Sequence, residues 1–180
     1  MKEKKSFFAA LAATGAAAVM LFGLSAVLAP LAQRSAEAER SEMMALLLPG
    51  SDTFTPEADS GEDPSITAVY QGDGGYVVET TTGGYVGDVT LLVGVSSGGK
   101  VTGVVVRDME ETWGLGARAL RDTKFLSQFL GTSGEAAVGE DVDAMTGATV
   151  TSKAIARGVN AAVGFVTGAD VTSGATEWGG

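Results

Sequence analysis

Four segments between Ile66 and Arg107 are separated by short turns rich in glycine, and the first two alternate in the manner of strands. The segments are 66–70, 75–82, 89–95 and 100–107. Alternation with a period of two is typical of strands that bury one face. The stretches Gln71-Gly72-Asp73-Gly74 and Ser96-Ser97-Gly98-Gly99 have the composition of hairpin turns. Because turns this short join antiparallel neighbours, the pattern predicts an antiparallel, meander-like sheet.

A helical pattern follows the predicted sheet near the end of the chain. Its apolar residues recur close to an i, i+4 spacing, with Lys153, Arg157 and Asn160 between them. The apolar positions are Val150, Ile155, Val159, Ala162, Val163 and Phe165. Successive strands followed by helices predict an α+β fold, with a mainly antiparallel sheet and flanking helices.

The N-terminus has the composition of a membrane anchor. Lys2, Lys4 and Lys5 precede a run from Phe7 to Leu31 that has no charged residue. A helix of this run is long enough to cross a hydrocarbon core of about 30 Å. A cleavable signal peptide normally has a shorter apolar region, so we expect an uncleaved transmembrane helix. The lysines predict a cytoplasmic N-terminus. The domain that follows the anchor is then expected on the outer side of the cell (inner) membrane.

Four regions are predicted along the chain: an anchor at 1–31, a helix and linker at 32–65, a folded domain at 66–168 and a flexible tail at 169–180. The helix of the second region is expected at 32–48 and ends at Pro49-Gly50. Residues 51–65 are rich in Ser, Asp, Glu, Gly and Pro and are expected to form a linker or surface loop.

Composition excludes several classes of function. The formal net charge is −10, which argues against nucleic acid as a partner, because such proteins cluster Lys and Arg. The chain contains no Cys and no His. These absences argue against disulfides, thiolate chemistry, iron–sulfur ligation and most zinc sites. If the protein handles electrons, it must therefore use an organic cofactor.

The segment from Asp143 to Ser152 combines an acidic start, a Thr-Gly-Ala turn and three hydroxyl residues before the predicted helix. Thr149 is expected where the helix begins, a position at which Ser, Thr, Asp and Asn are common caps. Unpaired amides and the positive end of the helix dipole favour phosphate at such a place. On spacing alone, an ordinary capped helix start explains the pattern equally well.

The spacing Asp143-x-x-Thr146-Gly147-Ala148-Thr149 resembles the flavinylation motif of FMN-binding domains in the Rnf and sodium-pumping quinone reductase families. In those families a flavin transferase joins the phosphate of FMN to the last Thr through a phosphodiester bond. The resemblance implies Thr149 as the attachment residue and covalent FMN as the cofactor. It implies that the transferase reads Asp143, Thr146, Gly147 and Ala148. The predicted cofactor-binding residues of this segment also include Thr146, Gly147, Ala148, Thr151 and Ser152.

Two further stretches carry the resemblance. Gly84-Tyr85-Val86-Gly87-Asp88-Val89-x-Leu91-Leu92-Val93-Gly94-Val95 resembles the strand pair before the flavin loop in the Rnf G subunit. Glu111-Thr112-Trp113-Gly114-Leu115-Gly116 resembles the Glu-Thr-Pro-Gly-Leu-Gly loop near the flavin, with Trp113 in place of Pro. The resemblance implies that Glu111, Thr112, Gly114 and Leu115 line the ring pocket.

The resemblance implies a membrane-anchored electron carrier that belongs to an Rnf-type ion-translocating oxidoreductase complex (a translocase) and is not catalytic alone. Its partners would be the other membrane subunits and the flavin transferase. One alternative is the C subunit of a sodium-translocating NADH:quinone reductase or another extracytoplasmic flavin carrier. A different class is a non-redox, membrane-anchored binding module in which the motif only caps a helix.

Two other patterns compete with this interpretation. Gly114-Leu115-Gly116-Ala117-Arg118-Ala119 fits the dinucleotide fingerprint, which requires a helix packed on a parallel sheet. A helix at 117–130 would serve that site, but the strands are predicted to be antiparallel. Asp170-Val171-Thr172-Ser173-Gly174-Ala175-Thr176 repeats the flavinylation motif, with only four residues after it. We expect a flexible tail there, although this second match to the motif makes Thr176 a competing attachment residue.

Overall fold

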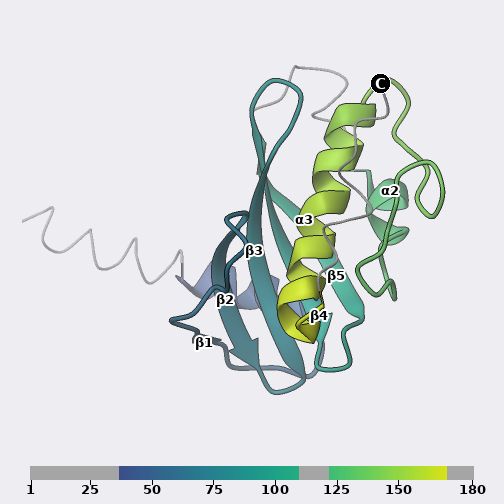
Figure 1. Ribbon diagram of the computed structural model, residues 1–180. Helices are drawn as coiled ribbons and strands as arrows, with labels where there is room; N and C mark the ends of the chain where they lie inside the picture. Colours follow the sequence, from purple (N-terminus) through teal and green to yellow (C-terminus); the bar gives the residue numbers. More distant parts are fainter. Residues whose placement is uncertain (1–36, 110–121, 170–180) are drawn as a thin grey trace, which may run out of the picture. The chain divides into compact units, whose positions relative to one another are not determined.

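The computed structural model describes residues 37–109 and 122–169 (Figure 1). The chain divides into two compact units, residues 1–40 and residues 41–180, and the second contains the sheet. The predicted anchor at 1–31 lies outside the described residues. Among the residues that are described, no helix is both long enough and apolar enough to cross a membrane.

Five antiparallel strands form one sheet in the order in which they occur along the chain. They are β1 (Thr55–Pro56), β2 (Ile66–Gly72), β3 (Gly75–Gly83), β4 (Asp88–Ser96) and β5 (Val101–Met109). The predicted antiparallel meander is therefore confirmed. The prediction of only linker or loop at 51–65 is wrong for β1, which pairs with Tyr70 and Gln71. A two-residue strand is too short to show a period in the sequence.

The helix α3 (Thr149–Thr167) lies across one face of the sheet, over β3 and β4 (Figure 1). Its buried residues Ile155 and Val159 belong to the same core cluster as Val78, Leu91 and Val93 of the strands. Side chains of a strand alternate between its faces, so one face of β3 and β4 meets this helix. The helix with its apolar stripe, predicted from the i, i+4 pattern, is confirmed.

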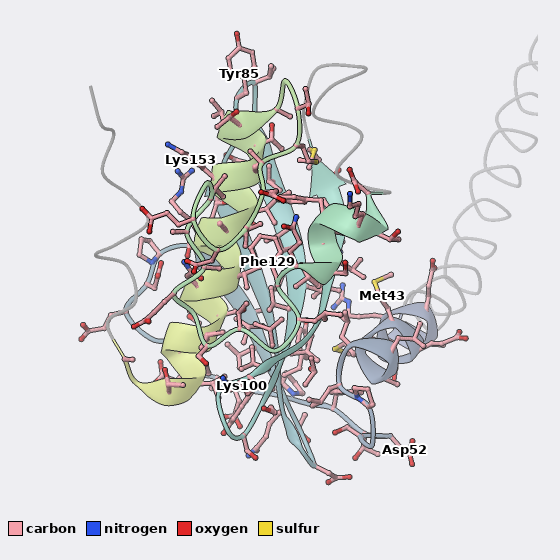
Figure 2. The ribbon with its side chains drawn as sticks, turned by 90° about the vertical axis from the view of Figure 1, so that its right-hand side faces the viewer. Met43, Asp52, Tyr85, Lys100, Phe129 and Lys153 are labelled. Carbon is pink, nitrogen blue, oxygen red and sulfur yellow. The ribbon has the colours of Figure 1, made fainter. Side chains whose placement is uncertain are left out.

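The opposite face of the sheet is covered in part by residues 43–48. Residues 37–47 are helical, as the sequence predicts for the described part of this segment. Met44, Leu47 and Leu48 pack with Val77 and Leu92, which alternate with the strand residues under α3. In Figure 2 the helix that carries Met43 and the helix α3 that carries Lys153 lie on either side of the strands. The described fold is thus a sheet between two helical layers.

A short helix, α2 (Thr123–Ser127), follows β5 in the described chain. The Phe125 amide donates a hydrogen bond of 3.0 Å to the carboxylate of its N-cap, Asp122. Phe125 and Phe129 meet edge to face, with ring centroids 5.4 Å apart, and both belong to the core. The dinucleotide alternative requires a parallel sheet, whereas every strand pair in the described sheet is antiparallel. Its glycine fingerprint lies outside the described residues.

Helix α3 approaches β3 closely at Gly158. A Cβ atom at Gly158 would lie 2.7 Å from the Thr80 hydroxyl oxygen and 2.8 Å from Leu91 Cδ1. Thr80 is fully buried, and its hydroxyl is the buried side-chain polar atom that has no hydrogen-bond partner among the described residues. A buried hydroxyl without a partner lowers stability, because it loses its bonds to water and gains none in return.

We therefore expect Thr80→Val to stabilise the protein by about 1 kcal/mol, because valine keeps the shape and removes the unsatisfied hydroxyl. The free energy of unfolding, measured by denaturant titration, tests this. Thr82→Val is the matched control, because the Thr82 hydroxyl donates a 2.8 Å bond to the Ala154 carbonyl. That variant should lose stability. Equal losses in both variants would show that the Thr80 hydroxyl has a partner.

Candidate functional site

A tight turn shapes the segment that carries the predicted attachment motif. The Ala148 amide donates to the Met145 carbonyl at 2.9 Å, which closes a β-turn over Thr146 and Gly147. Gly147 has φ +79°. A positive φ at the third position of a turn is characteristic of type II turns and favours glycine there. The Thr-Gly-Ala sequence therefore forms a turn because of the conformation that glycine allows.

The turn leads directly into α3. Ala148 is the N-cap, with φ −134° and ψ 41°, and it makes no side-chain cap bond. Thr149 is the first helical residue, so its predicted place at the start of the helix is confirmed, although the N-cap is Ala148 and not Thr149. The reason is that the turn ends at Ala148, one residue before Thr149. The Ser152 amide makes the first bond of the helix, donating to Ala148 at 2.9 Å.

The amides of Thr149, Val150 and Thr151 precede that first helical bond. The first amides of a helix have no acceptor within it, and the alanine N-cap supplies none from its side chain. These amides point along the helix axis at its positive end, which favours a phosphate or another anion. The helix start therefore has the properties that the sequence predicts for phosphate binding.

Exposure divides the predicted site residues into two groups. Asp143, Thr146, Gly147 and Thr149 are exposed, and Ala148 is buried between them. Thr151 and Ser152 are buried, with exposed fractions of 2% and 0%. The Ser152 hydroxyl accepts a 3.0 Å bond from the Met145 amide and donates a 2.9 Å bond to the Ala148 carbonyl. A direct contact of Thr151 or Ser152 with a cofactor stays a prediction.

The tip of the β3–β4 hairpin lies beside the start of α3. The Thr82 hydroxyl donates to the Ala154 carbonyl at 2.8 Å, and Arg157 Nη2 donates to the Gly83 carbonyl at 2.7 Å. Tyr85 and Val86 of this tip are 72% and 63% exposed. Figures 1 and 2 place the tip and the first turn of α3 at the same end of the sheet. Two large exposed side chains thus lie at the end of the sheet where α3 begins.

Sequence reasoning assigned no role to Tyr85 and Val86 as individual residues. A signal was present, because a Tyr-Val pair at the centre of a glycine-bounded hairpin turn is unusual for a solvated loop. The sequence did not reveal that this hairpin reaches the start of a helix that follows it far along the chain.

A basic side chain also lies close to Thr149 on the helix surface. Lys153 is exposed and follows Thr149 by four residues, a spacing that brings side chains together on one face of a helix. Asp143 is an exposed acidic residue of the same segment. Lys153 therefore offsets negative charge near Thr149.

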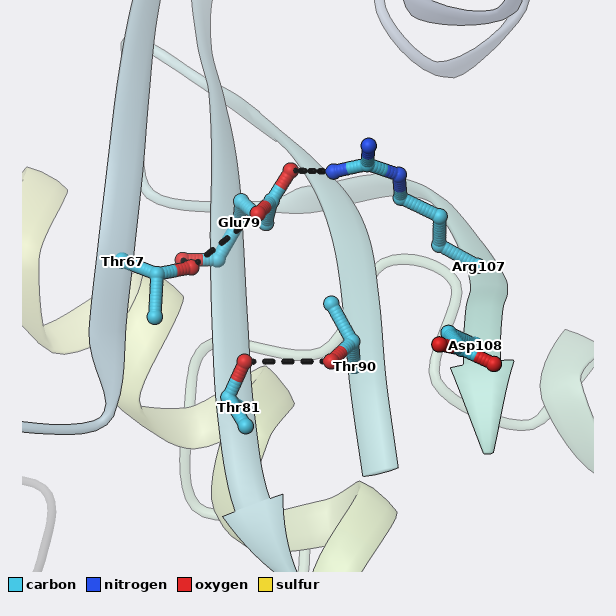
Figure 3. A pocket seen from close by; sticks show the side chains of 6 residues that line it. All are labelled: Thr67, Glu79, Thr81, Thr90, Arg107 and Asp108. Atoms are coloured by element: carbon cyan, nitrogen blue, oxygen red, sulfur yellow. Dashed lines mark hydrogen bonds and ion pairs between the residues drawn. The ribbon is translucent and has the colours of Figure 1, made fainter. Parts of the chain in front are cut away.

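A polar hollow lies elsewhere, on the face of the sheet away from α3 (Figure 3). Its volume is about 410 Å³, and it is lined by Thr67, Glu79, Thr81, Thr90, Arg107 and Asp108. Glu79 forms an ion pair with Arg107 and accepts a 3.2 Å bond from the Thr67 hydroxyl, and the Thr81 and Thr90 hydroxyls lie 3.1 Å apart. These groups largely satisfy one another. No predicted site residue lines this hollow.

The predicted ring-pocket residues Glu111, Thr112, Gly114 and Leu115 lie outside the described residues. The second copy of the motif, which ends at Thr176, lies outside them as well. The structure therefore brings together the attachment segment, the start of α3 and the hairpin tip.

A family model matches the part of the chain that contains these features. Residues 84–164 match the model described as "FMN-binding domain". The match begins at the hairpin tip, includes β4, β5 and α2, and extends through the attachment segment into α3. All the predicted cofactor-binding residues fall within it.

Three curated relatives belong to one kind of complex. The chain is 37% identical over 100 residues to the G subunit of the Na⁺-translocating ferredoxin:NAD⁺ oxidoreductase complex of Acetobacterium woodii, covering 49% of this chain and 47% of the relative. It is 41% identical over 99 residues to the G subunit of the proton-translocating ferredoxin:NAD⁺ oxidoreductase complex of Clostridium ljungdahlii, covering 51% and 53%. The chain thus spans about half the length of these two relatives.

A third relative is matched over more of its length. The chain is 33% identical over 143 residues to the G subunit of the ion-translocating oxidoreductase complex of Methanosarcina acetivorans, which covers 71% of this chain and 75% of the relative. The sequence motif, the helix start that suits phosphate and the family match all indicate an FMN-binding domain. The chain belongs to the FMN-binding domain family, among the G subunits of Rnf-type ion-translocating oxidoreductase complexes.

Proposed function

We propose that this chain is a membrane-anchored electron carrier whose FMN is attached to Thr149 through a phosphodiester bond. The observation that carries the proposal is the position of Thr149. It is an exposed threonine, the first residue of a helix with an uncapped start, and it follows a glycine turn in the region that matches the FMN-binding domain. In forming the ester, Thr149 Oγ1 loses its proton and displaces the leaving group of an activated FMN donor.

The chain's own groups would then hold the phosphate. The first amides of α3 donate to its oxygens, and Lys153 contributes a positive charge from the next turn. FMN supplies electron transfer in one- or two-electron steps when it is bound. The protein needs no acid–base residue for such a role, which agrees with the absence of His and Cys from the chain.

We expect the hairpin tip to face part of a flavin ring on Thr149, because the tip and the start of α3 lie at the same end of the sheet. Tyr85 and Val86 expose apolar area beside the helix start, and an aromatic side chain there can stack against a planar ring. The resemblance adds Glu111, Thr112, Gly114 and Leu115 to the ring pocket. The ring would thus be covered by the hairpin tip and by that loop.

The complex and the membrane complete the proposal. The relatives are named as subunits of ion-translocating complexes, which supports other membrane subunits as partners of this chain. The uncharged run from Phe7 to Leu31 supports a single anchor, with a flavin domain on the outer face. Maturation requires a flavin transferase that acts on the same side of the membrane.

Fluorescence that survives denaturation tests the covalent attachment. The protein is produced together with a flavin transferase and run on a denaturing gel under ultraviolet light. A fluorescent band at the mass of the chain supports the proposal. A protein that binds no flavin at all would instead support the non-redox binding module, and one that releases its flavin on denaturation would exclude the covalent bond.

We also expect the flavinylated domain to be a carrier without a substrate of its own. Dithionite should reduce it and oxygen should reoxidise it, while NADH should not reduce it at a useful rate, because no nicotinamide site is supported. Absorbance near the flavin band follows each reaction. Steady oxidation of NADH by the purified domain, free of membrane subunits, would contradict this expectation.

A further inference from the structure

The loop from Gln128 to Ala148 connects α2 to α3 and carries most of the attachment motif. Among the described residues it contains no helix or named strand, and its one ladder contact is the isolated bridge between Val138 and Val142. Long loops without regular structure are uncommon in compact domains and usually serve a function. The backbone groups of such a loop still need hydrogen-bond partners when they are buried.

Three side chains each make two hydrogen bonds to the backbone of this loop. Gln128 accepts from the Asp143 amide at 2.9 Å and donates to the Asp143 carbonyl at 3.3 Å. Asn160 accepts from the Ala136 amide at 3.2 Å and donates to the Ala136 carbonyl at 3.2 Å. Ser152 bonds to Met145 and Ala148, as described above. A side-chain amide that bonds to both the amide and the carbonyl of one residue makes the two hydrogen bonds that a neighbouring strand would otherwise make.

Two of these side chains bracket the attachment turn. Gln128 holds the backbone at Asp143, and Ser152 holds it at Met145 and Ala148. Thr146, Gly147 and Thr149 remain exposed. The backbone is therefore fixed on both sides of the turn while the motif's hydroxyl groups stay accessible.

Gln128 and Ser152 are themselves held in place by the packing of α2 and α3. Ser152 is fully buried on α3, which packs on the sheet, and its bonds are shielded from water. Gln128 is the C-cap of α2, between the core residues Phe125 and Phe129. Hydrogen bonds in a buried setting are stronger than exposed ones, so the Ser152 pair should contribute more than the Gln128 pair.

We infer that Gln128 and Ser152 are positioning residues that hold a group attached at Thr149 in one orientation against the domain. The inference rests on the proposed attachment of FMN to Thr149. Neither residue touches the attachment atom. Each acts through the backbone of the turn, which sets the direction in which Thr149 and the first amides of α3 point.

The first test measures the hydrogen bonds of Gln128 and Ser152 to the turn in the unmodified full chain, without cofactor. Amide hydrogen exchange at Met145 should quicken by on the order of tenfold in Ser152→Ala, because the hydroxyl that accepts this amide is lost. Exchange at Asp143 should quicken in Gln128→Ala by a smaller factor. Gln128→Glu keeps an acceptor for the Asp143 amide and should fall between wild type and Gln128→Ala. Unchanged exchange in both alanine variants would overturn the inference.

The second test measures the attached flavin in the modified protein. Fluorescence anisotropy of the flavin should fall in both variants toward the value of the denatured flavoprotein, while the thermal midpoint of Gln128→Ala stays close to that of wild type. Ser127→Ala and Gln71→Ala are the matched controls, because both side chains are exposed and neither contacts the motif. Both controls should keep the anisotropy of wild type.

The outcomes separate this inference from the proposed function. A wild-type protein without covalent flavin contradicts the attachment at Thr149. The exchange experiment still decides whether Gln128 and Ser152 hold the backbone of the turn. Covalent flavin with the same anisotropy in wild type, Ser152→Ala and Gln128→Ala overturns the positioning role alone. If Ser152→Ala does not fold, Gln128→Ala carries both measurements, because its bonds lie at the surface.

Discussion

Thr149→Val should carry no covalent flavin, whereas wild type produced under the same conditions should carry one per chain. Valine has the shape of threonine and lacks the hydroxyl oxygen that forms the ester. Thr149 is exposed and its side chain does not cap α3, so the fold should change in stability by less than about 0.5 kcal/mol. Gel fluorescence after denaturation, together with the intact mass, measures the loss.

Three control variants make this experiment specific. Thr149→Ser keeps a hydroxyl at the same place and should be modified at least in part. Thr146→Val removes the other exposed hydroxyl of the turn and should slow modification without abolishing it, because the resemblance implies that the transferase reads Thr146 but attaches FMN to Thr149. Thr176→Val tests the second copy of the motif and should keep the flavin. A fluorescent Thr149→Val band would move the attachment to Thr176 or another residue.

Gly94→Val should destabilise the domain by about 4 kcal/mol, a loss comparable to that caused by severe core substitutions. A Cβ atom at Gly94 would lie 2.1 Å from the Leu47 carbonyl oxygen and 2.7 Å from its carbonyl carbon. Because these are backbone atoms, no rotation of a side chain can relieve the overlap. The residues that include Met44 and Leu48 must then leave the sheet and expose their apolar surface.

The free energy of unfolding from denaturant titration measures this loss. Gly83→Val is the matched control, since Gly83 also lies in a strand and a Cβ there would meet nothing within 4 Å. That variant should unfold within about 1 kcal/mol of wild type. A Gly94→Val protein as stable as the control would mean that the helical residues before Pro49 do not pack on β4.

The sequence determined the sheet and the position of the attachment motif. The period of two, with short glycine turns, predicts an antiparallel meander because both signals act between neighbouring residues. The start of α3 within one residue of its predicted position follows from the turn at Gly147 and the apolar stripe beyond it. The resemblance to Rnf G subunits, which rests on the motif around Thr149, is confirmed by the family match.

Only the tertiary structure decided what surrounds Thr149. The bonds from Gln128 to Asp143 and from Asn160 to Ala136 span 15 and 24 residues, and Arg157 reaches Gly83 across 74 residues. No local pattern specifies such pairs, because their geometry depends on how α2 and α3 pack on the sheet. The burial of Ser152 beneath the turn has the same origin. A motif shows which hydroxyls are present, and packing decides which of them face solvent and which hold the backbone.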